Sequence, residues 1–115
     1  MRTLIVGSDS MCRKEELIRA ISEAPWKISS VVCINHNRFF SLIKQIISEI
    51  GKPLIIFNGS WFERFKFSRP VLDDAVKASD AVLAVWDGKD ILIQTLISIS
   101  FDNEKLVYIY YSNKE

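Results

Sequence analysis

Three short polar segments contain most of the residues that could take part in catalysis or ligand binding, and each segment follows an apolar run. They are Gly7-Ser8-Asp9, Asn35-His36-Asn37-Arg38 and Asp87-Gly88-Lys89-Asp90. His36, the single histidine, titrates near neutral pH and suits acid–base work. Arg38 offers a planar fork of donors for a phosphate. The segments therefore have the residue types for acid–base chemistry or for contact with a phosphate.

Each segment also has a purely structural interpretation. Gly7-Ser8-Asp9 is typical of a strand-to-helix turn in which Asp9 or Ser10 caps the helix. Asp87-Gly88-Lys89-Asp90 equally fits a tight turn followed by an aspartate cap. His36 has no obvious carboxylate partner in the sequence, and a lone histidine in a loop is most often solvated. Both interpretations stay open for all three segments.

A fourth candidate lies between residues 58 and 67, a long connection for so small a domain. It carries four aromatic side chains that could stack on a base or contact a protein: Trp61, Phe62, Phe65 and Phe67. The formal net charge of +1 favours packing or a protein contact over nucleic acid.

The polar segments must be positioned by the apolar runs before them. The run Ala81 to Trp86 is continuous and short, which is typical of a strand buried on both faces of a parallel sheet. Similar runs alternate with amphipathic segments, which predicts a single α/β domain over residues 1–115 with a doubly wound, mostly parallel five-stranded sheet. Strands are expected at 2–6, 28–34, 53–57, 81–86 and 106–111. Such sheets bind ligands at the carboxyl ends of their strands.

Composition limits the function classes. Fifteen basic residues against fourteen acidic ones argue against nucleic-acid binding. No apolar run approaches the ~20 residues of a membrane helix. Cys12 and Cys33 lack a CxxC spacing and predict neither a zinc site nor a redox pair, so no metal or cofactor is expected and the cytoplasm is the expected compartment.

The predicted helix from Ile91 to Phe101 has more apolar residues than one buried face needs. With Ile93, Leu96, Ile97 and Ser100 facing the sheet, Leu92 and Ile99 fall on a flank. This surplus predicts a homodimer through the helix, with Phe40 as a further contact.

These segments together resemble the SLOG superfamily of Rossmann-like domains. The resemblance rests on Gly7-Ser8, on Trp61 with Glu63-Arg64-Phe65, on Pro70 and above all on the run from Ser79 to Lys89. Its relatives include nucleotide phosphoribohydrolases and the DNA-processing protein, and nucleoside deoxyribosyltransferases carry a similar pattern. The resemblance implies a nucleotide-derived ligand at the strand ends. The ligand-binding residues are then expected to be Gly7, Ser8, Asp9, Asn35, His36, Arg38, Trp61, Asp87, Gly88 and Lys89.

The sequence departs from the family where phosphate should bind. Asp9 replaces the arginine of Gly-Ser-Arg, the stretch Ile34 to Phe40 has no glycine, and Leu92-Ile93 replaces a Gly-Thr pair. Side chains at these positions keep backbone amides away from a phosphate. The leading hypothesis is therefore a non-catalytic SLOG-like domain that binds a nucleotide-derived small molecule or a protein partner. The alternative is an N-glycosidic hydrolase or transferase with Asp9, His36 and Asp87 near the chemistry.

Overall fold

A computed structural model describes the chain except for residues 9, 11–12, 36–37, 59–68 and 112–115. Five parallel strands form one sheet in the order β3-β2-β1-β4-β5. The strands are β1 (Arg2–Gly7), β2 (Ser30–Asn35), β3 (Leu54–Asn58), β4 (Ala81–Trp86) and β5 (Leu106–Tyr111). The helices between them are α1 (Lys14–Glu23), α2 (Arg38–Ile50), α3 (Arg69–Lys77) and α4 (Ile91–Asp102).

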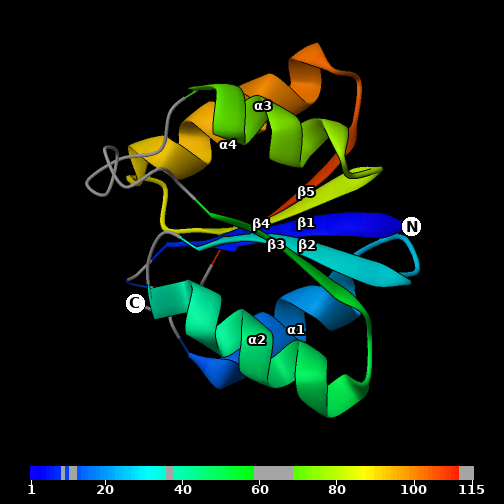
Figure 1. The fold of residues 1–115 in the computed structure, drawn as a ribbon. Coiled ribbons are helices and arrows are strands. Elements are labelled where there is room, and N and C mark those ends of the chain that lie inside the picture. The colour runs from blue at the N-terminus through cyan, green and yellow to red at the C-terminus, as the bar shows by residue number, and fades with distance from the viewer. Residues whose placement is uncertain (9, 11–12, 36–37, 59–68, 112–115) are drawn as a thin grey trace.

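The helices lie in two layers. α1 and α2 cover one face of the sheet, and α3 and α4 cover the other (Figure 1). This is the doubly wound, Rossmann-like α/β architecture that the sequence predicts, and the sheet is entirely parallel.

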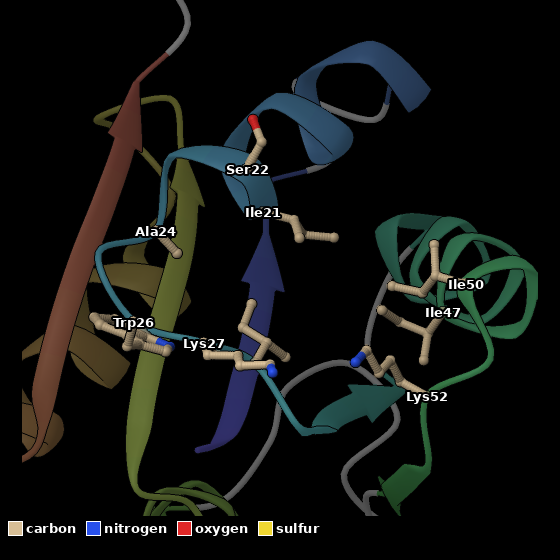
Figure 2. Close-up of a pocket in the computed structure, with 9 residues that line it drawn as sticks. Ile21, Ser22, Ala24, Trp26, Lys27, Ile47, Ile50 and Lys52 are labelled. Atoms are coloured by element: carbon tan, nitrogen blue, oxygen red, sulfur yellow. The ribbon is translucent and has the colours of Figure 1, made fainter.

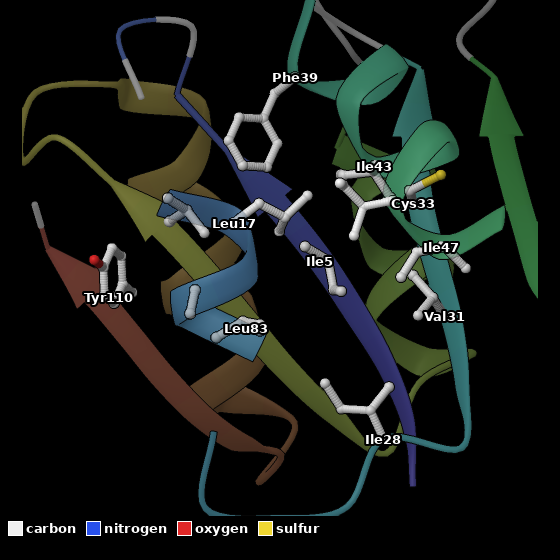
Figure 3. Packing of buried hydrophobic residues seen from close by; sticks show 13 residues of the cluster. Ile5, Leu17, Ile28, Val31, Cys33, Phe39, Ile43, Ile47, Leu83 and Tyr110 are labelled. Atoms are coloured by element: carbon white, nitrogen blue, oxygen red, sulfur yellow. The ribbon is translucent and has the colours of Figure 1, made fainter. Parts of the chain in front are cut away.

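Each face of the sheet has its own apolar core because side chains alternate along a strand. In β4, Leu83 points to the core under α1 and α2, which Figure 3 shows, and its neighbours Val82 and Ala84 point to the core under α3 and α4. Residues 81 to 85 are all buried, as expected for a strand covered on both faces.

The start of α1 differs from the prediction. Its N-cap is Arg13, which makes no side-chain capping hydrogen bond, so the predicted cap at Ser10 is wrong. The Ser10 hydroxyl instead donates to the Asp87 carboxylate across the sheet end. Asp9 lies outside the described residues. Glu15 and Glu16 do lie in the first turn of α1, as the helix dipole favours.

The burial of α4 also differs from the prediction. Ile99 is only 1% exposed, and Leu92 is half-buried against the core between α4 and the sheet. α3 lies beside α4 on the same face of the sheet. α4 therefore buries residues against α3 as well as against the sheet, whereas a single surface helix would expose them to solvent. The apolar flank is therefore explained within the monomer. The homodimer stays a prediction, and the exposed apolar residues left on α4 for it are Ile91 and Phe101.

No helix in the described part of the chain has both the length and the apolar character needed to cross a membrane.

Candidate functional site

The candidate site lies where the strand order reverses. β1 is flanked by β2 on one side and by β4 on the other, so the connections from their carboxyl ends diverge, and open α/β sheets bind their ligands at such a point. Ser8 follows β1 and Asp87 follows β4, which puts two predicted site residues at this point.

Hydrogen bonds join the two strand ends directly. The Ser8 amide donates to the Val85 carbonyl over 3.0 Å. The Asp87 amide donates to the Ser8 hydroxyl oxygen over 3.3 Å, and the Ser8 side chain is buried. Ser8 thus serves as a link between β1 and β4.

The Asp87 carboxylate organises the turn after β4. One oxygen accepts the Ser10 hydroxyl over 2.7 Å, and the other accepts the amides of Lys89 and Asp90 over 2.8 and 3.0 Å. Gly88 takes a φ of +83°, a conformation that glycine adopts without strain. The hydrogen bonds lower the pKa of Asp87 below its ordinary value of 3.8, with the one from Ser10 contributing most.

The next carboxylate caps α4. One oxygen of Asp90 accepts the amides of Leu92 and Ile93 over 2.9 and 3.3 Å, so the predicted aspartate cap is confirmed. Four backbone amides at the start of α4, those of Lys89, Asp90, Leu92 and Ile93, therefore donate to the carboxylates of Asp87 and Asp90. A phosphate bound at a helix N-terminus uses amides of this kind.

Gly7 ends β1, and the ring of Phe39 fills the space above it. A Cβ added to Gly7 would overlap that ring, and Phe39 is fully buried. The missing side chain of Gly7 thus makes room for Phe39 at the first turn of α2. Asn35 and Arg38 are exposed at the end of β2 and the start of α2.

An aromatic pair lies at the ends of β4 and β5. The rings of Trp86 and Tyr111 are 5.8 Å apart and tilted by 36°. The Trp86 indole donates to the Asp90 carbonyl over 3.1 Å, which ties the pair to the start of α4. Tyr111 is half-exposed, and it lies in register with Trp86 at the end of the neighbouring strand. Sequence reasoning missed Tyr111, although its place at the end of the strand after α4 is a usable signal.

The structure thus brings together half of the predicted site residues at the ends of β1 and β4, and these are Gly7, Ser8, Asp87, Gly88 and Lys89. Asn35 and Arg38 lie at the next strand end. Asp9, His36 and Trp61 lie outside the described residues. Within the residues that the structure does describe, no three histidine, cysteine, aspartate or glutamate side chains gather as a metal site would require.

Asp87→Asn is expected to remove a pH-dependent part of the stability. A carboxylate with a lowered pKa stabilises the folded state above its unfolded-state pKa, and this contribution is lost as pH falls through the folded-state pKa. The wild type should exceed Asp87→Asn in free energy of unfolding at neutral pH, and the gap should close below the ordinary value of 3.8. Urea unfolding along a pH series measures this. The exposed Asp74→Asn on α3 is the control, and a gap that stays constant or widens in acid would show that Asp87 is not held as described.

The chain gave no match when it was compared with protein-family models, with curated proteins and with solved structures. The fold and the geometry of the strand ends are therefore the grounds for a function.

Proposed function

We propose that this chain is a non-catalytic, SLOG-like binding domain that holds a nucleotide-derived small molecule at the ends of β1 and β4. The observation that carries the proposal is the occupation of the α4 amides by Asp87 and Asp90. A SLOG-type enzyme needs these amides for substrate phosphate, and here two negative charges stand in that place.

The ligand groups that suit this site are a sugar and a base. The Ser10 hydroxyl donates to the Asp87 carboxylate over 2.7 Å, and the oxygens of both groups keep lone pairs that can accept from vicinal ribose hydroxyls. The half-exposed Tyr111, backed by Trp86, offers a flat face for stacking a base. Phosphate is disfavoured by repulsion from both carboxylates, so the proposed ligand is recognised as a nucleoside.

A protein partner is the second candidate ligand, because an apolar side chain is exposed at the start of α4. Ile91 is 74% exposed at the first turn of α4, close to the Trp86 hydrogen bond at Asp90. An aromatic pair next to an exposed isoleucine is the composition of a small protein-contact surface. This surface and the nucleoside site overlap, so one titration distinguishes them.

The test is a titration of the four common ribonucleosides and their 5′-monophosphates into labelled protein, followed by NMR at the Trp86 indole. We expect one nucleoside to shift that signal in a saturable way and to bind more tightly than its monophosphate, with no free base released. Asp87→Asn should weaken the nucleoside, and Asp74→Asn should not. Tighter binding of a monophosphate, or base release that Asp87→Asn abolishes, would support the enzyme instead, and no binding by any nucleoside would favour the protein partner.

A further inference from the structure

A pocket lies on the side of α1 and α2, near the amino ends of β2 and β3, whereas the proposed nucleoside site is at the carboxyl ends of β1 and β4. It has a volume of about 240 Å³ and is formed by the last turns of α1 and α2 with the segments that lead into β2 and β3 (Figure 2). Most of its wall is apolar. The lining residues are Ile21, Ser22, Ala24, Trp26, Lys27, Ile28, Ile47, Ile50 and Lys52.

The walls of the pocket are fixed by hydrogen bonds. The Trp26 indole donates to the Thr3 hydroxyl over 3.0 Å, which holds the ring against the sheet. Beyond α2, Gly51 has a φ of +72°, and the Lys52 amide donates back to the Ile47 carbonyl over 3.2 Å. This arrangement is a glycine-terminated helix end, and it directs the chain across the mouth of the pocket. The pocket is therefore formed before any ligand arrives, which lowers the cost of binding.

Two lysines supply the polar part of the pocket. Figure 2 shows the side chains of Lys27 and Lys52 extending toward its centre from opposite sides. Among the residues that the structure describes, neither ammonium group has a carboxylate within ion-pair distance. The acids at the ends of the two helices are engaged elsewhere, Glu23 with the Tyr108 hydroxyl and Glu49 with Lys14.

The ends of α1 and α2 set the charge that a ligand would meet. Each helix C-terminus carries about −0.5 of a charge, which is less than the full positive charge of each lysine. A ligand with one negative charge is therefore attracted by the two ammonium groups. The volume is below the roughly 300 Å³ at which pockets for drug-sized ligands begin, so the ligand must be small.

We propose that this pocket binds a small organic carboxylate whose compact apolar body fills the isoleucine and tryptophan wall. The carboxylate lies between Lys27 and Lys52, and the body contacts Trp26, Ile47 and Ile50. This site is independent of the nucleoside site, because it uses neither the same strand ends nor any of the same residues.

The test uses phenylacetate as the probe and phenylacetamide as its uncharged counterpart of the same shape. In NMR titrations of the whole chain, phenylacetate should saturate and shift the Trp26 indole and the Ile47 methyl signals. It should bind about tenfold more tightly than the amide, as two partly exposed charge contacts allow. Equal affinity for the two probes, no saturation, or shifts that map elsewhere would overturn the proposal.

Substitutions distinguish the contribution of the two lysines from that of the apolar wall. The double substitution Lys27→Gln with Lys52→Gln should abolish the preference for the carboxylate and leave the amide unchanged. Lys44→Gln is the matched control, since Lys44 lies over the Phe40 ring on another part of α2. Ile50→Gln, at a side chain already half-exposed, should weaken both probes without unfolding the protein. A carboxylate preference that survives the double substitution would also overturn the proposal.

Discussion

Gly7→Ala is expected to destabilise the protein by about 2–3 kcal/mol, the upper part of the range for inserting a carbon into a filled core. The added Cβ meets the ring of Phe39, a fully buried side chain that cannot swing into solvent. Urea unfolding followed by far-UV circular dichroism measures the loss. A change well under ~1 kcal/mol would mean that Phe39 does not fill the space above Gly7.

A double-mutant cycle shows whether Phe39 is the cause. Gly7→Ala should cost much less in a Phe39→Leu background, because the smaller side chain leaves room for the methyl group. Gly88→Ala is the control: Gly88 has a φ of +83° and open space around it, so its cost is conformational. The effects of Gly88→Ala and Phe39→Leu should add, and coupling between them as strong as that at Gly7 would contradict the assignment.

Ile99→Ala is expected to cost about 2–4 kcal/mol, as for other buried large-to-small substitutions. Ile99 is 1% exposed and belongs to the core that α4 shares with α3 and the sheet. Phe101→Ala, at a side chain 61% exposed on the same helix, should stay within about 0.5 kcal/mol of the wild type.

The two α4 variants also test the homodimer. Under the sequence-based prediction Ile99 is a contact between subunits, and its truncation would then lower the stability in a way that depends on protein concentration. The structure predicts the same loss at every concentration. A strong concentration dependence for Ile99→Ala would restore the original interpretation of the helix.

The sequence predicts the fold well because the fold rests on local patterns. The predicted bounds of β4 and β5 agree with the structure to the residue. β4 is covered on both faces, so it has no polar position to blur its ends. β5 is partly exposed, and its apolar run is bounded in the sequence by Glu104-Lys105 and by the polar residues after Tyr111. Pro25 lies just beyond the end of α1, and Pro70 lies in the first turn of α3, which are positions that proline favours.

The site is predicted less well because its content depends on contacts distant in sequence. Ser10 has the chemistry of a helix cap, and only the closeness of β1 and β4 brings its hydroxyl to Asp87, 77 residues away. The partner of Gly7 is a phenylalanine ring from α2, which no local pattern indicates. Local chemistry did predict the Asp90 cap, because its partners are two and three residues away.

The burial of α4 shows the same limit. A helical wheel assumes one buried face, and it placed Ile99 on a wet flank. The contact with α3 covers that flank, and the wheel of a single helix carries no information about a second helix beside it. Counting apolar positions therefore indicated the surplus but could not show that part of it, at Ile99, packs within the chain. The homodimer itself stays a prediction.

The most direct test of the proposed function is an amide-resolved NMR titration with inorganic phosphate, followed at Lys89, Asp90, Leu92 and Ile93. These four amides are the donors that Asp87 and Asp90 occupy. We expect no saturable shift at any of them in the wild type, because the carboxylates fill and repel the anion position. Saturable shifts of the four amides together with inorganic phosphate would show that the start of α4 is a working phosphate site and would contradict a non-catalytic domain that recognises only sugar and base.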